Sequence, residues 1–131
     1  MKTGILKKSL SSCLSKEKQV IFAFLYGSYA KGTALKDSDL DIAVYFRRKP
    51  TANEVDRIWD ELQRISGKDV ELLVLNNAKE SIAWQAIRGI PLLINNWALY
   101  IGFMLRVSFE AMDFQRDVEE IWMRKKRLGY A

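Results

Sequence analysis

The stretch YGSYAKGTALKDSDLDIAV, residues Tyr26–Val44, decides which fold we expect for this chain of 131 residues. The apolar run Val20–Tyr26 that leads into it is typical of a β-strand covered on both faces. Gly27 and Ser28 interrupt that run, and the residues after them predict a short helix over Ser28–Leu35. A glycine lets a phosphate approach the backbone, and a helix start offers free N–H groups to an anion.

Two aspartates, Asp39 and Asp41, stand one residue apart in the second strand of this stretch. They alternate with the apolar residues Leu40, Ile42 and Val44. Side chains at positions i and i+2 of a strand point to the same side, with Cα atoms about 6–7 Å apart. We therefore expect one face in the core and both carboxylates on the other. Such a pair suits Mg²⁺, which commonly binds one or two carboxylates together with substrate phosphates.

The amino-acid composition limits the class of protein and the kinds of catalytic and metal site that we expect. A hydrophobic fraction of 49% and a charged fraction of 28% describe an ordinary globular protein, and the length predicts one domain over residues 1–131. The net charge of +5 does not distinguish a nucleotide substrate from RNA or an acidic partner. The chain contains no histidine, which excludes His-ligated zinc and histidine-based catalysis and directs attention to the carboxylates.

Cysteine content and hydropathy predict a cytoplasmic protein. The single Cys13 excludes an intramolecular disulfide, fits a reducing compartment, and is expected in the core. We see no signal peptide, and the longest apolar runs, Val20–Tyr26 and Trp97–Leu105, are far shorter than the roughly 20 residues that span a bilayer. We therefore expect no membrane contact.

Helices and strands are also predicted on both sides of this stretch. Thr51 and Glu54 form the sequence pattern of a capping box, and the helix that they begin should end at Ser66-Gly67 with Trp59 in the core. The other predicted elements are a helix over residues 5–17, a turn at Lys36-Asp37-Ser38, a strand at 69–75, a helix at 78–88 and an edge strand at 91–94.

A long C-terminal helix is expected over residues 97–127. Its apolar residues recur at spacings of three and four: Leu99, Phe103, Val107, Ala111, Phe114, Val118 and Trp122. A stripe of this length exceeds what a domain of this size can bury. We therefore expect the helix to pack partly on the sheet and partly on another chain, as a homo- or hetero-oligomer.

The spacing of Gly27-Ser28 and Asp39-Leu40-Asp41, with ten residues between them, resembles the signature of the DNA polymerase-beta-like nucleotidyltransferase superfamily. With Ala30, Gly32 and Ser38, the pattern resembles more closely the minimal nucleotidyltransferases (MNT), many of which are antitoxins encoded beside HEPN-domain RNase toxins. The resemblance implies an α+β fold like the polymerase-beta palm, with a small mixed, largely antiparallel sheet and flanking helices. Its core would span residues 20–95.

The resemblance also implies roles for individual residues. The third carboxylate of the family falls at Val70-Glu71-Leu72, which makes Glu71 the candidate, with Asp69 as the alternative. A glutamate reaches one methylene further than the aspartate of the family. The implied catalytic and metal-binding set, for one or two Mg²⁺ ions, is Asp39, Asp41 and Glu71. The implied nucleotide-binding set, for ATP, is Gly27, Ser28, Lys31 and Ser38.

Three functions are compatible with these features. The first is an Mg²⁺-dependent adenylyltransferase that acts as an antitoxin by attaching AMP to a tyrosine of a HEPN toxin from an adjacent gene. The second is a non-catalytic antitoxin that blocks the toxin sterically through the C-terminal helix. The third is adenylylation of a small molecule, although enzymes of that kind usually carry an additional helical domain. Nucleic-acid binding is not expected, since the chain has no further domain to hold a template.

Overall fold

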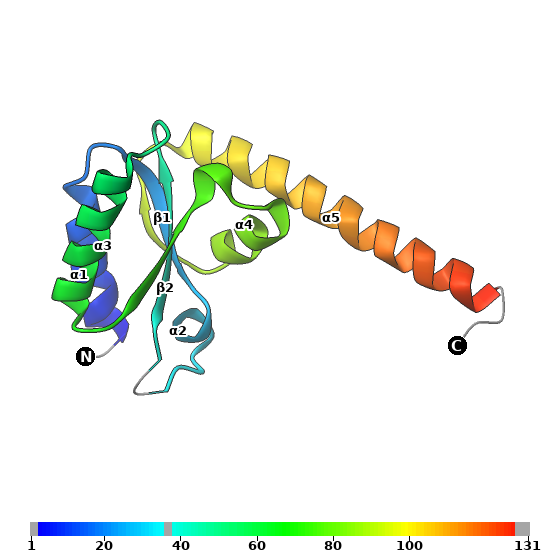
Figure 1. Cartoon of the computed structure of the whole chain (residues 1–131), viewed down its shortest axis with the longest axis horizontal. Helices are drawn as coiled ribbons and strands as arrows, with labels where there is room; N and C mark the ends of the chain where they lie inside the picture. Colours follow the sequence, from blue (N-terminus) through cyan, green and yellow to red (C-terminus); the bar gives the residue numbers. More distant parts are fainter. Residues whose placement is uncertain (1–2, 36–37, 128–131) are drawn as a thin grey trace.

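A four-stranded sheet forms the middle layer of the computed structural model, which describes residues 3–35 and 38–127 (Figure 1). The strands are β1 (Val20–Tyr26), β2 (Leu40–Phe46), β3 (Val70–Val74) and β4 (Ile90–Ile94), in the spatial order β3-β2-β1-β4. Strand β1 pairs antiparallel with β2 and with β4, whereas β2 and β3 are parallel. The expected mixed, largely antiparallel sheet is confirmed.

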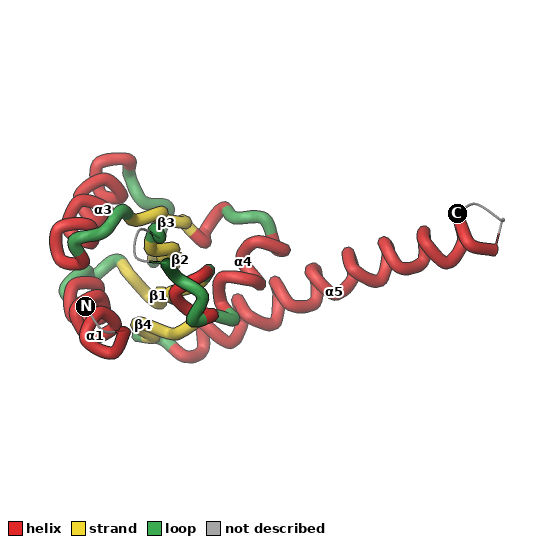
Figure 2. The backbone as a smooth tube through the Cα atoms, turned by 90° about the horizontal axis from the view of Figure 1, so that it is seen from below, coloured by secondary structure: helices red, strands yellow, loops and turns green. Residues whose placement is uncertain are grey.

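Helices cover both faces of this sheet (Figure 2). On one face lie α1 (Thr3–Ser15) and α3 (Ala52–Ser66), and on the other lie α4 (Glu80–Ile87) and α5 (Trp97–Arg127). A single turn, α2 (Ser28–Lys31), follows β1, and a short 3-10 helix, η1 (Leu75–Asn77), follows β3. The described part of the chain is thus a three-layer α/β/α domain.

Strand β1 lies at the centre of the fold because both of its faces are buried. Ala23 and Leu25 pack into the core beside α1 and α3, while Phe22 and Phe24 pack into the second core beside α4 and α5. Strand β2 is covered in the same way, since Ile42 joins the first core and Ala43 the second. The face of β2 that carries the aspartates therefore turns into core after Asp41, which the alternating pattern alone does not indicate.

Helix α1 confirms the expected position of Cys13. Its buried residues are Leu6, Leu10, Cys13 and Leu14, so the thiol is a core group. Ile5, at the start of the helix predicted over residues 5–17, is instead 57% exposed. Only one side of a helix faces a flat layer, and Ile5 lies beside that side rather than on it.

Helix α3 begins and ends as its sequence predicts. The Thr51 side chain accepts from the Glu54 amide, and the Glu54 carboxylate accepts from the Thr51 amide, so the capping box is complete. Gly67 ends the helix in the left-handed conformation, at φ 66°. Trp59, however, is 38% exposed rather than core, because its indole N–H donates to the Val70 carbonyl at the edge of the sheet.

Helix α2 is shorter than the predicted Ser28–Leu35. It ends at Lys31 because Gly32 adopts the left-handed conformation, at φ 72°. The predicted turn at Lys36-Asp37-Ser38 falls mostly outside the described residues, which resume at Ser38.

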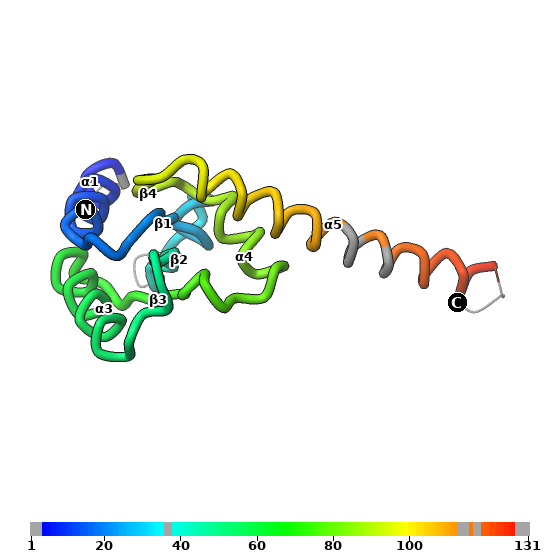
Figure 3. Tube along the Cα trace, turned by 90° about the horizontal axis from the view of Figure 1, so that it is seen from above, coloured from blue at the N-terminus to red at the C-terminus, as the bar shows by residue number. Residues whose placement is uncertain are grey.

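Helix α5 packs on the domain only through its first half. Phe103 and Val107 are buried against the second core, whereas Leu99 and Trp122, both expected in the apolar stripe, are exposed. The side chains of Phe114 and Val118 lie outside those described. The second half projects away from the other elements (Figure 3) and exposes Ile121, Trp122 and Met123. Among the described helices, none has the length and apolarity needed to cross a membrane.

We predict that Thr51→Ala lowers the free energy of unfolding by about 1 kcal/mol, since the Glu54 amide loses its side-chain acceptor. Urea denaturation followed by circular dichroism measures this change. Thr51→Ser keeps the hydroxyl and should stay within about 0.5 kcal/mol of the parent protein. Equal destabilisation by both variants would contradict a role for the cap.

We also predict that Cys13 is unreactive in the folded protein. Burial raises the pKa of the thiol, with a further increase from the charges of Glu61 and Glu17, so less thiolate is present at a given pH. Ellman's reagent at pH 8 should react at least about tenfold more slowly with the native protein than with the urea-unfolded chain. Equal rates would show that the α1–α3 layer opens readily.

Candidate active site

A sharp turn at Gly27 separates β1 from α2 and opens the candidate site. Gly27 has φ 71° and ψ −148°, a conformation that L side chains rarely adopt. The first amides of α2, like those of any helix, have no intrahelical partner. Gly27 is the N-cap of α2 and has no side chain that could accept from them. Because α2 is one turn long, these amides and the Ser28 hydroxyl, rather than a helix dipole, are what the turn offers to an anion.

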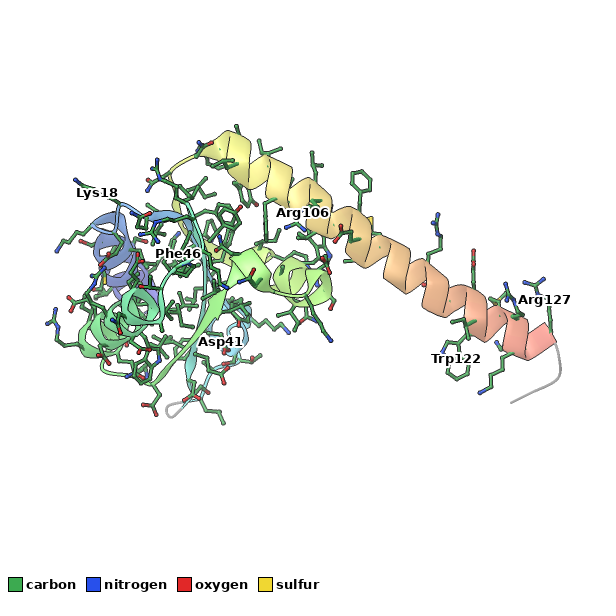
Figure 4. All side chains as sticks on the ribbon, turned by 45° about the horizontal axis from the view of Figure 1, so that its top comes forward. Lys18, Asp41, Phe46, Arg106, Trp122 and Arg127 are labelled. Carbon is green, nitrogen blue, oxygen red and sulfur yellow. The ribbon has the colours of Figure 1, made fainter. Side chains whose placement is uncertain are left out.

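The sheet register aligns three side chains beside this turn. Tyr26 of β1 is opposite Asp41 of β2, and Asp41 is opposite Glu71 of β3. Asp39 directly precedes β2 rather than lying in it and is exposed. A Cβ on Gly27 would lie 2.1 Å from Asp41 Oδ2, so the glycine turn and the carboxylate pair form one continuous site. Figure 4 shows Asp41 near α2, well away from the second half of α5.

The electrostatics of these groups reflect crowded negative charge. Burial, a hydrogen bond with the Glu71 side chain, and the charges of Glu71 and Asp39 raise the pKa of Asp41 to about 6. Burial and the charges of Asp41 and Glu71 raise the pKa of Tyr26 to about 12. The Tyr26 hydroxyl therefore keeps its proton near neutral pH, and burial and nearby negative charge disfavour the ionised form of Asp41.

This donor set fits a hard divalent cation. Asp41 and Glu71 approach each other closely enough to hydrogen-bond, and a cation between them would relieve the repulsion that raises the Asp41 pKa. Within residues 3–35 and 38–127, no three acidic, histidine or cysteine side chains converge at metal-binding geometry. Two carboxylates are nevertheless enough protein ligands for Mg²⁺, because this ion commonly binds one or two carboxylates and completes its coordination shell with phosphates and water.

The structure distinguishes the two candidates for the third carboxylate by position. Both side chains are exposed, but Glu71 lies on β3 in register with Asp41, whereas Asp69 precedes β3. The Asp69 backbone carbonyl accepts a hydrogen bond of 2.9 Å from the Leu40 amide, which anchors the start of β2. The geometry favours Glu71 as the partner of Asp41.

Ser38 and Lys31 occupy different surroundings. The Ser38 hydroxyl accepts from the Leu35 amide at 2.8 Å, and the Ser38 amide donates to the Leu35 carbonyl, so these two hydrogen bonds hold Ser38 to Leu35 directly before Asp39. Lys31 is exposed and lines a half-open pocket of about 640 Å³ beside Gly27. Its nucleotide-binding role and that of Ser38 stay predictions.

Sequence reasoning missed Tyr26 and the residues that α4 adds to this pocket, Gln85 and Arg88. Tyr26 could have been found by aligning the antiparallel strands on either side of the Gly-Ser turn. Gln85 and Arg88 carry no comparable signal, because nothing near them in sequence indicates that the end of α4 returns to Gly27.

Comparisons with known proteins identify the family and the fold of this chain. Residues 8–97 match the family described as Polymerase beta, Nucleotidyltransferase. Protein adenylyltransferase MntA of Thermococcus cleftensis is 32% identical over 66 residues, which cover 50% of this chain and 67% of that protein.

Two solved structures share the fold. A chain in a crystal structure of a toxin–antitoxin with AMP-PNP has a TM-score of 0.74 at 20% identity, covering 90% of this chain and 96% of that chain. A chain in a structure of tri-AMPylated Shewanella oneidensis HEPN toxin in complex with MNT antitoxin has a TM-score of 0.71 at 17% identity, covering 94% and 98%. At these identities the two structures establish the fold.

We predict that Gly27→Ala disrupts the site while Gly32→Ala does not. Both glycines have φ near +70°, but Gly32, at ψ 16°, lies in the left-handed helical region, whereas Gly27, at ψ −148°, lies in a region that is almost exclusive to glycine. Backbone strain therefore costs an alanine about 1 kcal/mol at Gly32 and more at Gly27. Only at Gly27 would the new Cβ collide with Asp41, whereas nothing lies within 4 Å of a Cβ at Gly32. Gly27→Ala should therefore lower the melting temperature more and abolish nucleotide binding; similar behaviour of the two variants would contradict the close approach.

Proposed function

Since the chain belongs to the polymerase beta nucleotidyltransferase family and is an enzyme of the nucleotidyltransferase type, we propose that it transfers AMP from ATP to a tyrosine of a HEPN-domain RNase toxin and so acts as an antitoxin. The relative with 32% identity is a protein adenylyltransferase, and the fold neighbours include an MNT antitoxin complex with an AMPylated HEPN toxin. The toxin would be encoded in an adjacent gene.

The contact between Gly27 and Asp41 is the observation that carries this proposal. A phosphate on the Gly27-Ser28 amides would lie directly beside the Asp41 and Glu71 carboxylates, as transfer at the α-phosphorus requires. Asp41 and Glu71, with Asp39 at the strand start, would hold Mg²⁺. When bound, Mg²⁺ supplies charge neutralisation and orients the attacking and leaving oxygens.

The residues of the chain then have separate tasks. The amides of the Gly27 turn, the Ser28 hydroxyl and Lys31 would bind the phosphates. The tyrosine oxygen of the toxin attacks the α-phosphorus, the bond to the pyrophosphate oxygen breaks, and pyrophosphate leaves. The hydroxyl proton passes to a carboxylate of the site, for which Glu71 is our candidate. The Ser38 turn would hold Asp39 at the edge of the site.

The part of α5 that follows Val107 favours a second candidate, a binding antitoxin that does not use the chemistry. Phe109, Met112 and Trp122 are each more than half exposed on a helix that projects from the domain. An apolar surface of this kind is typical of a protein–protein contact. In this alternative the helix would cover the toxin and the carboxylates would be dispensable.

We predict that intact-protein mass spectrometry detects AMP adducts on the HEPN toxin after incubation with this protein, ATP and Mg²⁺. The Asp39→Asn/Asp41→Asn double variant should form none, and EDTA should abolish the adducts formed by the parent protein. A tight complex without adducts would favour the steric antitoxin. Adducts that persist in the double variant would contradict the assigned site.

Glu71→Gln and Asp69→Asn form a matched pair within this assay, because each removes one charge near the start of β3. We expect Glu71→Gln to slow adduct formation by about 100-fold or more and Asp69→Asn to leave it within about threefold. The reverse order would assign the third carboxylate to Asp69.

A further inference from the structure

The pocket beside Gly27 extends beyond the residues to which the proposed function gives roles. It has a volume of about 640 Å³, and α2 and the end of α4 contribute to its lining. Its lining contains two cationic side chains, Lys31 and Arg88, and no acidic side chain. A cavity with this charge, open to solvent and adjoining a carboxylate pair, suits an anionic extension of the same ligand.

The connection from α4 to β4 brings Arg88 to this pocket. Leu25 of β1 is opposite Ile90, the first residue of β4, and Gly89, directly before it, lies against Leu25 and Tyr26. Gly89 lies so close to β1 that a Cβ on it would be 2.2 Å from the Leu25 carbonyl oxygen. The turn from α4 into β4 is therefore pressed against the end of β1, and Arg88 stays beside the Gly27 turn.

The surroundings of Arg88 leave its donors available. Its guanidinium lies 5.3 Å from the centre of the Trp84 ring, one helical turn earlier, and this contact restricts the side chain. Other arginines of the described part of the chain form ion pairs with glutamates, among them Arg48, Arg57, Arg64 and Arg106. Neither Arg88 nor Lys31 has such a partner within the described residues.

We propose that Arg88 binds the β- and γ-phosphates of the nucleoside triphosphate together with Lys31, which also lines the pocket. The planar guanidinium matches a phosphate through two parallel N–H donors, which a lysine cannot reproduce. This assignment rests on the proposed function for the identity of the ligand. Arg88 is thus a substrate-binding residue from outside the Gly-Ser and Asp-x-Asp segments.

A simpler role for Arg88 is to complement the dipole at the C-terminus of α4, which it caps. That role would affect the stability of α4 and leave nucleotide affinity unchanged. Nucleotide affinity therefore distinguishes the two roles.

The test is calorimetric titration of the full chain with ATP, AMP and inorganic tripolyphosphate, each with Mg²⁺. We expect Arg88→Ala to weaken ATP and tripolyphosphate binding by about tenfold or more and AMP binding by less than about threefold. Arg106→Ala is the matched control, since Arg106 is also exposed above an aromatic ring, 5.2 Å from the centre of Phe103, but does not line the pocket. It should bind all three ligands like the parent protein.

Arg88→Lys retains the charge, and we expect it to recover only part of the affinity because the paired donors are lost. Melting temperatures of all variants verify that each is folded. Unchanged ATP affinity in folded Arg88→Ala, or an equal loss for AMP and ATP, would overturn the proposal.

Failure of this inference and failure of the proposed function give different results. If AMP adducts form on the toxin and Arg88→Ala binds ATP normally, the phosphate assignment is wrong and the function stands. If tripolyphosphate binds in an Arg88-dependent way and no adduct forms, the phosphate assignment stands and the function is wrong. If the parent protein binds neither ATP nor tripolyphosphate, both are wrong.

Discussion

The close approach of the Gly27 backbone to the Asp41 carboxylate is the constraint on which this structure depends. Only a residue without a Cβ fits there, because any side chain would start 2.1 Å from Asp41 Oδ2. The same residue must adopt φ 71°, which glycine tolerates best. One glycine therefore turns the chain sharply after β1 and brings backbone amides next to a carboxylate, so that the proposed phosphate site and the proposed metal-binding pair adjoin.

The rest of the domain keeps that contact in place against an unfavourable charge distribution. The like charges of Glu71 and Asp39 and the burial of Asp41 disfavour its ionised form. Burial of β1 and β2 on both faces offsets this cost, since their apolar side chains fill two cores. Local strain at a functional site, maintained by packing elsewhere, is a common arrangement in enzymes.

Helix α5 has a part that packs on the domain and a part whose apolar side chains stay exposed. Phe103 and Val107 close the second core, and beyond them the helix carries exposed apolar side chains with no layer of the domain to cover them. A helix that leaves the domain in this way would offer the proposed partner a contact surface without obstructing the candidate site near Asp41 (Figure 4). Binding and chemistry would then use separate ends of one small protein.

The sequence by itself determined the elements and the motif. The apolar run of β1, the Thr51–Glu54 capping box and the Gly-Ser and Asp-x-Asp segments are local patterns, and local patterns are dictated by neighbouring residues. Only the tertiary structure decided which distant groups meet. The opposition of Asp41 to Glu71, the exposure of Trp59, the single turn of α2 and the return of Arg88 to Gly27 depend on strand register and layer packing. Those are set by contacts between residues far apart along the chain, which no local pattern contains.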